Sequence, residues 1–209
     1  KFDENGSQKE TADDWTKYGD PWSYRRYNHT VKIQFPDHTV LAVPYDVPII
    51  GYETSNIGTL RLWQCEAEEE LDFDAFNAQD YQRALDAKNK AEDITRVLYP
   101  NDSTWEGKRL RVKQQYVLSS ASLQDIIRTY KEAHGSDLSR FADFTAVQLN
   151  DTHPAMSIPE LIRLLTAEHG MEMDEAIQVV SRTCAYTNHT ILAEALEKWP
   201  MEFFRKAVP

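Results

Sequence analysis

The chain has 209 residues, of which 41% are hydrophobic and 27% are charged, a composition typical of a globular protein with one sizeable core. Its formal net charge of -11 argues against a nucleic-acid partner, which needs a basic surface, and fits a neutral polyol ligand better. No run of about eighteen apolar residues occurs, so we expect no membrane span. Cys65 and Cys184 lie far apart, which favours a reduced cytoplasmic pair over a structural disulfide.

Both ends of the chain predict a fragment of a longer protein. It opens at Lys1 without a methionine, in a polar stretch, and it closes at Pro209 directly after a helical pattern. We interpret residues 1–209 as a single fragment, with a β-rich section over 1–63 and a section of helices and parallel strands over 79–209.

The first section is rich in prolines and in short runs of β-branched residues. These runs predict antiparallel strands. Prolines after the runs predict turns at 36–37 and 44–46. The expected strands cover residues 31–35, 39–43 and 59–63.

Two helical patterns follow. Apolar residues recur with a helical period over 79–98, and Pro100 ends this helix because proline disfavours the α conformation in the residue before it. A second helix is expected over 113–132, and Ser122 is a plausible cap that would divide it in two.

A β-α-α-β order at the end of the chain predicts a parallel sheet with helical crossovers. A strand over 145–149 precedes a helix that begins at Ser157, with Glu160 placed for a capping box. Asp174 is expected to cap the next helix, and a second strand covers 184–186.

Polar residues gather where each of these two strands ends. Asn150, Asp151 and His153 follow the first strand, and Asn188 and His189 follow the second. Ligands of open α/β sheets bind beyond the carboxyl ends of the strands, so these side chains stand where a site is expected. The alternative is purely structural: Asp151 forms a turn with its own backbone, and Asn188 or Thr190 caps a helix that carries Glu194.

A metal site is a further alternative. Asp151, His153 and His189 form a possible Asp-His-His ligand set if the two loops are adjacent. The chain has no HExxH or CxxC motif to supply the usual ligand spacing, so we predict no metal.

Seven ordered segments resemble the α-glucan phosphorylases, the glycogen, starch and maltodextrin phosphorylases. The resemblance extends from Ala12 to Pro200, and its sharpest blocks lie at both strand ends. The segments are ADDWTKYGDPW (12–22), AVPYDVPIIGY (42–52), TLRLW (59–63), ITRVLYPNDS (94–103), LRVKQQYVLSSASLQDIIR (110–128), LNDTHPAMSIPELIRLL (149–165) and AYTNHTILAEALEKWP (185–200).

The resemblance implies a fold and a reaction. The chain is expected to form part of the N-terminal Rossmann-like lobe of a two-lobed glycosyltransferase (GT-B) fold, an α/β architecture that begins here with an antiparallel section. Members of the family cleave the terminal α-1,4-linked glucose of a glucan with inorganic phosphate, and glucose 1-phosphate is released. Their cofactor is pyridoxal phosphate, whose own phosphate assists proton transfer, and the parent protein is expected to be a cytoplasmic homodimer.

The resemblance also assigns roles to individual residues. His189 is expected to bind the 6-hydroxyl of the reacting glucose, with Asn188 beside it. Asp151 and His153 resemble the pair that holds glucan on the acceptor side of the bond. Tyr99 is expected to stack on a sugar and Asp102 to stand on a gate loop, with supporting roles for three residues: Arg111, Asn150 and Glu194.

Two departures limit what the chain is expected to do. Arg128 is followed by Thr129, where nucleotide-regulated animal enzymes carry a second arginine, so activation by AMP is not expected. The lysine that carries pyridoxal phosphate and the cluster that binds substrate phosphate are absent from the chain, so we expect it to be inactive alone. The alternative function is a glucan-binding or interaction domain without catalysis.

Overall fold

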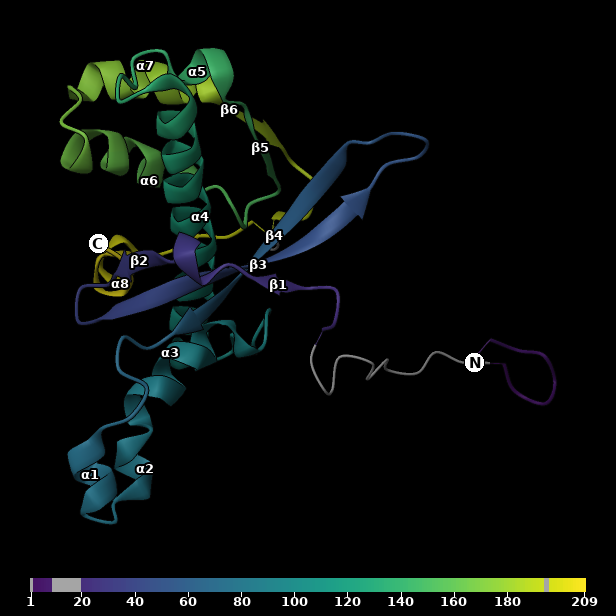
Figure 1. Ribbon diagram of the computed structural model, residues 1–209, viewed down its shortest axis with the longest axis vertical. Coiled ribbons are helices and arrows are strands. Elements are labelled where there is room, and N and C mark those ends of the chain that lie inside the picture. The colour runs from purple at the N-terminus through teal and green to yellow at the C-terminus, as the bar shows by residue number, and fades with distance from the viewer. Residues whose placement is uncertain (1, 9–19, 194–195) are drawn as a thin grey trace.

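A 30-residue helix, α4 (Trp105–His134), runs through the middle of the molecule and carries a hydrophobic core on each of its halves. An antiparallel sheet packs on its N-terminal half, and shorter helices gather around its C-terminal half (Figure 1). The computed structural model describes residues 2–8, 20–193 and 196–209. Within them the fold is a mixed α/β arrangement of two sheets and the helices that cover them.

The first sheet is antiparallel and is built around one long strand, β3. The short strands β1 and β2 pair along one edge of β3, and β4 pairs along the other edge over ten residues. A 3-10 helix, η2, connects β1 to β2. The bounds are β1 (Tyr24–Arg25), η2 (Tyr27–His29), β2 (Val31–Gln34), β3 (Thr39–Ile50) and β4 (Ile57–Glu66).

The turn predicted at 36–37 is present, but the turn predicted at 44–46 is wrong. Pro44 lies inside β3 and pairs with Trp63 of β4. Its carbonyl accepts a hydrogen bond from the Arg26 amide on the opposite edge, so the missing N–H of proline also faces that edge and not β4. Proline therefore leaves the ladder between β3 and β4 intact.

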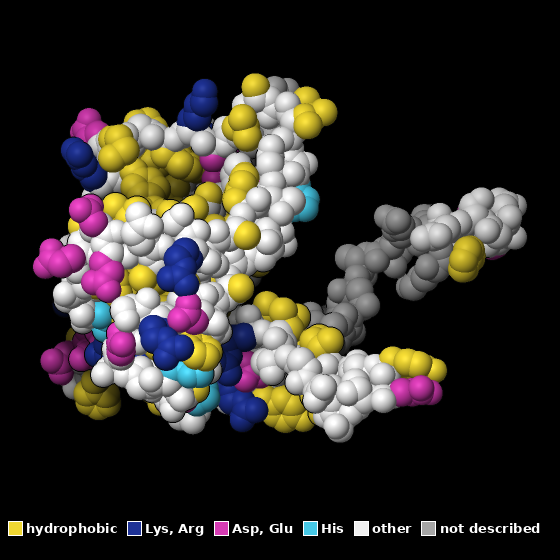
Figure 2. Space-filling view, turned by 90° about the horizontal axis from the view of Figure 1, so that it is seen from above, with side chains coloured by type: hydrophobic (Ala, Val, Ile, Leu, Met, Phe, Trp, Pro, Cys, Tyr) yellow, Lys and Arg dark blue, Asp and Glu magenta, His cyan; other side chains and the backbone are white. Residues whose placement is uncertain are grey.

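The distal half of the β3–β4 hairpin projects from the body of the molecule (Figures 1 and 2). Its apolar side chains are largely open to solvent, with Ile50 78% and Tyr52 89% exposed. The proximal half is buried instead, because Val40, Ala42 and Cys65 face α4 and form part of the first core.

Three short helices connect the hairpin to α4. The predicted helix over 79–98 is divided at Leu85, which ends one helix and precedes the next. Asp72 and Asp80 cap the first two helices by accepting a hydrogen bond from the amide three residues on. The helices are α1 (Phe73–Asn77), α2 (Tyr81–Ala84) and α3 (Asp86–Arg96).

The helix break expected at Ser122 is absent, because α4 continues through it. The Ser122 hydroxyl accepts a hydrogen bond from the Trp63 indole at 3.0 Å, so it joins the helix to β4 and caps nothing. A thirty-residue helix also lets one element serve both cores, with Val117 in the first and Leu123 in the second.

The elements around the second core follow the predicted β-α-α-β order along the chain. Strands β5 and β6 pair in parallel, as the alternation of elements predicted, and α5, α6, η3 and α7 cover them and the end of α4. The bounds are α5 (Phe141–Phe144), β5 (Val147–Asn150), α6 (Ser157–Arg163), the π-helical segment η3 (Leu164–Glu168), α7 (Met173–Thr183) and β6 (Cys184–Thr187).

Both helix caps predicted in this part are wrong. Helix α6 begins at Ser157, but Glu160 is buried and accepts from Ser120 and Arg163, so tertiary contacts replace the capping box. Asp174 lies in the first turn of α7, one residue after its start, and does not cap it. Glu160 thus has partners that the local motif did not predict.

The chain closes with helix α8 (Met201–Ala207), which packs against α4 beside the first sheet (Figure 1). Ala207 and Val208 are buried in the first core. A helix expected directly after His189 is not formed by residues 188–192 or 196–200. Over the described ranges, no helix is long and apolar enough to cross a membrane.

Candidate functional site

The two polar loops singled out in the sequence begin side by side. In the parallel pair β5–β6, Asn150 is in register with Thr187, so both loops leave the same edge of the sheet. The Asp151 amide donates a hydrogen bond to the Thr187 carbonyl at 2.7 Å and fastens one loop to the other strand. The sheet thus places Asp151 next to the start of the Asn188–Thr190 segment.

The Asp151–Pro154 loop has a restrained backbone. Asp151 adopts a left-handed conformation with φ of 65°, which aspartate tolerates better than most residues. Its Oδ1 atom accepts from the Thr152 amide at 2.9 Å, so part of the carboxylate serves the backbone, as the structural alternative predicted. The loop then turns into α6, and Asp151 and His153 are both half-buried.

A second wall comes from the segment before α4 and from the first turns of this helix. The Arg111 guanidinium lies 3.7 Å from the Asp102 carboxylate and its Cζ atom is 5.7 Å from the centre of the Tyr99 ring. The Tyr99 ring meets the His153 ring edge-on at 5.4 Å. Tyr99 also has a positive φ of 54° and is 68% exposed, so an aromatic face stays open beside the charged groups.

Glu197 joins these two walls, and the sequence did not identify it. Its carboxylate accepts from Arg111 and from Gln115 and lies 3.7 Å from His153 Nδ1. No spacing rule links residues 86 apart, so only the tertiary structure brings Glu197 to Arg111. The sequence offered one signal for this role: Glu197 is an acidic residue within a segment that resembles the family.

A cavity of about 620 Å³ opens between these elements. Asp102, Arg111, Asp151 and His153 all line it, so four of the predicted residues come together. Trp105, which packs its ring against Phe203, forms part of the rim. Other lining residues are Lys108, Thr152, Thr190, Leu196, Glu197, Lys198, Trp199 and Pro200.

Tyr99 lines a smaller neighbouring recess. This recess, of about 90 Å³, shares Arg111 and His153 with the main cavity and is otherwise walled by Leu98, Gln114, Gln115 and Leu118. Arg111 and His153 therefore separate a polar space from a largely apolar one.

Three other predicted residues, Asn150, Asn188 and His189, lie outside the cavity lining. The Asn188 side chain closes on Thr190, donating to its carbonyl at 2.7 Å and accepting from its amide at 3.2 Å, which is a local turn. His189 is exposed beyond the end of β6, and Asn150 is exposed at the end of β5. Glu194 lies outside the described residues.

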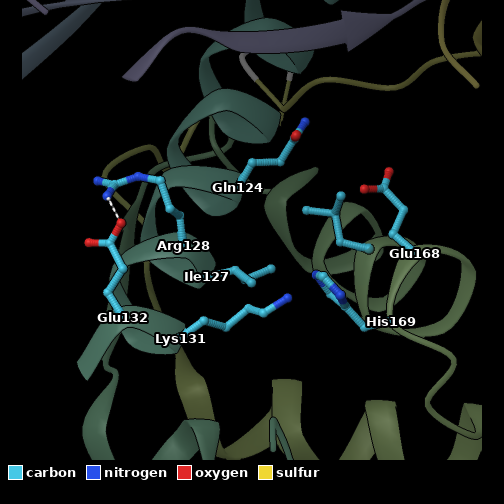
Figure 3. A pocket seen from close by; sticks show the side chains of 8 residues that line it. Gln124, Ile127, Arg128, Lys131, Glu132, Glu168 and His169 are labelled. Atoms are coloured by element: carbon cyan, nitrogen blue, oxygen red, sulfur yellow. Dashed lines mark hydrogen bonds and ion pairs between the residues drawn. The ribbon is translucent and has the colours of Figure 1, made fainter. Parts of the chain in front are cut away.

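Another pocket, of about 400 Å³, lies between α4 and the α6–η3 segment (Figure 3). Lys131 and His169 point into it. The pKa of His169 is lowered, mainly by burial and to a smaller extent by the positive charge of Lys131. Arg128 on its rim donates to Asp125 at 2.8 Å and to Glu132 at 2.7 Å. Its guanidinium is therefore already held by two carboxylates.

The described residues do not form a metal centre or a disulfide. Within residues 2–8, 20–193 and 196–209, no three His, Cys, Asp or Glu side chains gather closely enough to hold a metal ion. Cys65 and Cys184 are both free. Burial raises the pKa of the Cys65 thiol to about 12, so this thiol stays protonated at neutral pH.

Comparisons with known proteins agree over the whole length of the chain. A family model described as carbohydrate phosphorylase matches residues 1–209. The chain is 44% identical to the brain form of glycogen phosphorylase from Homo sapiens over 226 residues, which cover 98% of this chain and 27% of that protein. It is 43% identical to the human muscle form and 43% identical to the brain form from Bos taurus, with the same shares covered. The chain thus spans about a quarter of the length of these curated relatives.

Proposed function

The chain belongs to the carbohydrate phosphorylase family, and on this basis we propose that it forms the central part of the N-terminal lobe of an α-1,4-glucan phosphorylase. The parent enzyme removes the terminal glucose of glycogen, starch or maltodextrin with inorganic phosphate and releases glucose 1-phosphate. Its two Rossmann-like lobes form a GT-B fold, and the cavity between β5, β6 and α4 belongs to the cleft between them.

The observation that carries this proposal is the convergence of Asp102, Arg111, Asp151 and His153 on one cavity. Carboxylates accept hydrogen bonds from sugar hydroxyls, and the guanidinium and imidazole donate them. The open face of Tyr99 supplies the apolar surface on which a pyranose ring packs. A few convergent polar groups beside an aromatic ring are what recognition of a neutral sugar requires.

The charges in the cavity favour a neutral ligand over an anion. Arg111 faces two carboxylates, those of Asp102 and Glu197. The Lys108 ammonium donates to the Asp102 backbone oxygen at 2.7 Å. Since the guanidinium and the ammonium at the inner wall already have acceptors and Lys198 is exposed, we place glucan in this cavity and expect phosphate to bind elsewhere in the parent.

Within this proposal Asp151 and His153 hold sugars on the acceptor side of the scissile bond, and Tyr99 stacks on one of them. Asp102 stands on the loop that leads into α4 and controls access to the cavity. Arg111 and Asn150 support these contacts, and Glu194 has the same supporting role in the family resemblance.

His189 has the catalytic role in the proposal. It binds the 6-hydroxyl of the reacting glucose, with Asn188 beside it, and its backbone carbonyl approaches the anomeric carbon. A carbonyl dipole at that position stabilises the positive charge that develops in an oxocarbenium-like transition state. The exposed position of His189 at the end of β6 leaves it accessible to such a substrate.

Pyridoxal phosphate is the cofactor of the proposed parent, and the residues around the cavity do not fit it. A Schiff base with this cofactor needs a lysine whose amine is free and shielded from water, whereas the Lys108 ammonium donates to the Asp102 backbone oxygen and Lys198 is exposed. We therefore assign the cofactor to another part of the parent and derive no step through it. The chain alone is expected to bind glucan without cleaving it.

We also propose that the parent protein is a cytoplasmic homodimer and that AMP does not activate it. A reducing compartment suits its two free cysteines. Arg128, held by Asp125 and Glu132, is not free to bind a nucleotide phosphate, and Thr129 supplies no second guanidinium.

Incubation of the full-length protein with maltoheptaose and inorganic phosphate tests the function. We expect release of glucose 1-phosphate with the α configuration, followed by proton NMR, and no release when phosphate is omitted. Binding of maltoheptaose without release of glucose 1-phosphate would favour the alternative, a glucan-binding domain without catalysis. Absence of both binding and release would refute the proposed function.

A further inference from the structure

Glu197 is the group through which the two walls of the cavity contact each other. Arg111 donates to its Oε1 atom from Nε at 2.8 Å, and the Arg111 Nη2 atom lies 2.6 Å from the same oxygen. Gln115 donates to both carboxylate oxygens, at 3.1 and 2.9 Å. His153 Nδ1 lies 3.7 Å from Oε1. Side chains from α4 and from the loop after β5 therefore share one carboxylate.

The Glu197 carboxylate is also well shielded from water. Its side chain is 14% exposed and that of Arg111 is 20% exposed, whereas Asp102 is 47% exposed. A charge-assisted contact strengthens as water is excluded, so Glu197 holds Arg111 more firmly than Asp102 does. Arg111 in turn lies over the Tyr99 ring, which contacts His153.

We propose that Glu197 is a positioning residue that fixes Arg111 and His153 for glucan on the acceptor side of the cavity. This inference rests on the proposed function. Glu197 need not touch the sugar, because its oxygens are already occupied by Arg111 and Gln115. Glu197 holds the Arg111 and His153 side chains in place before glucan binds. The entropy cost of ordering these side chains is therefore smaller when glucan binds.

The negative charge of the carboxylate, 3.7 Å from His153 Nδ1, also bears on which ring nitrogen carries the hydrogen. An acceptor on the Nδ1 side favours the tautomer with its hydrogen on Nδ1 and leaves Nε2 for a sugar hydroxyl. It also gives Arg111 a counter-ion, which keeps the cavity suited to a neutral ligand.

Glutamine at position 197 would retain the shape of the side chain and lose this function. Arg111 and Gln115 are both donors toward Glu197, so an amide nitrogen in place of one oxygen would face a donor. The Glu197→Asp substitution retains the charge on a shorter side chain and should therefore restore part of the effect.

The test compares Glu197→Gln, Glu197→Asp and a matched control in the full-length protein. The control is Glu202→Gln on α8, which removes the same charge from a side chain that is 83% exposed and paired only with Lys206 among its described contacts. Maltoheptaose binding is measured by calorimetry, and KM and kcat are measured for phosphorolysis.

We expect Glu197→Gln to raise the Kd and the KM for maltoheptaose about tenfold. The kcat at saturating glucan should change less than about twofold, since the reacting glucose lies on the other side of the bond. Glu197→Asp should give an intermediate Kd, and Glu202→Gln should match the unmodified protein. A purely structural role would lower the amount of active protein and leave KM unchanged.

Two results would overturn the inference while leaving the proposed function intact. One is a Kd for Glu197→Gln that matches the Glu202→Gln control, and the other is a fall in kcat with an unchanged KM. If the unmodified protein neither binds maltoheptaose nor releases glucose 1-phosphate, the proposed function fails and the inference fails with it. Should Glu197→Gln not fold, Glu197→Asp decides the outcome by the same Kd comparison.

Discussion

The Arg111 guanidinium and the Glu197 carboxylate meet at 2.6 Å although the two residues are 86 positions apart. Arg111 belongs to the first turns of α4, and Glu197 belongs to the irregular segment before α8. Both side chains line the polar cavity, and the His153 ring lies between Glu197, at 3.7 Å, and the Tyr99 ring, at 5.4 Å between centres. The cavity is thus assembled by tertiary contacts around groups that the sequence had already singled out.

Asp151→Ala and His153→Ala are expected to weaken the use of long glucans more than turnover of the terminal glucose. On the proposed acceptor-side placement, each variant would lose hydrogen bonds to the acceptor sugars, which should lower kcat/KM for maltoheptaose about tenfold. The measurement is phosphorolysis of maltoheptaose and of maltotriose by the full-length protein. Equal losses on both substrates would contradict the acceptor-side placement.

His189→Ala is expected to lower turnover about a hundredfold or more, because it would remove the proposed contact to the reacting glucose. His189 is exposed, so the free energy of unfolding should change by less than about 1 kcal/mol. Steady-state kinetics and urea denaturation of the same preparation separate the two effects. An unchanged kcat would show that His189 does not take part in the reaction.

Gly107→Ala tests whether the loop that carries Asp102 must lie against α4. A Cβ atom at position 107 would collide with the Asn101 carbonyl and lie 3.0 Å from the Asp102 Cα atom. The loop must move, so we expect the KM for maltoheptaose to rise several-fold, with a loss of about 1–3 kcal/mol in unfolding free energy.

The matched control for this substitution is Gly58→Ala in β4, where the new Cβ would meet ordinary contacts at 3.6 Å or more. The KM of the control should stay within about twofold of the unmodified protein. If both alanine variants raise the KM equally, the position of Asp102 does not matter for glucan binding.

Asp46→Ala is expected to destabilise the first sheet by about 2 kcal/mol, because it removes the charged acceptor of two Arg61 hydrogen bonds and leaves Asp125 as the remaining carboxylate beside this partly buried guanidinium. Asp46 accepts from Arg61 Nε and Nη2, each at 2.7 Å, and from Arg26 at 3.2 Å. Urea denaturation of the full-length protein measures the change. Asp93→Ala, which breaks an exposed ion pair on α3, should cost less than about 0.5 kcal/mol.

The same contacts predict a dependence of stability on pH. Hydrogen bonds from Arg61 hold the pKa of Asp46 below its usual range, although burial acts in the opposite direction. The folded state therefore binds the Asp46 proton less tightly than the unfolded state does. This stabilisation is complete above the unfolded-state pKa of about 3.9 and is lost as the pH falls through the folded-state pKa. Asp46→Ala should abolish this part of the acid transition.

Cys65 is expected to resist alkylation until the protein unfolds. Burial raises the pKa of its thiol to about 12, so very little thiolate forms at pH 8 and the sulfur is also inaccessible. Stability from this group is present below the unfolded-state pKa of about 8.5 and decreases as the pH rises toward 12.

A Cys184→Ser variant leaves Cys65 as the one thiol of residues 1–209, and a Cys65→Ser variant leaves Cys184, which is only half-buried. Iodoacetamide labelling of the first variant should be about a hundredfold slower in the folded state than in urea. Rapid labelling of the folded protein would show that the first core opens readily.

The sequence by itself determined the class of the fold and the family resemblance. Strand periodicity predicted β2 and the hairpin turn at Pro36, and the order of elements predicted the parallel pair β5–β6. These features follow from local patterning, since side-chain periodicity and turn residues act between near neighbours. The same local rules predicted a turn at Pro44, a break at Ser122 and a capping box at Glu160, and all three were wrong.

Only the tertiary structure decided those three positions and the walls of the cavity. The orientation of Pro44 depends on which edge of β3 its nitrogen faces, and Ser122 and Glu160 are held by partners 59 and 40 residues away. Glu197 became a candidate residue only through contacts with Arg111 and Gln115. Long-range hydrogen bonds of this kind leave no period in the sequence, because packing of distant elements determines them.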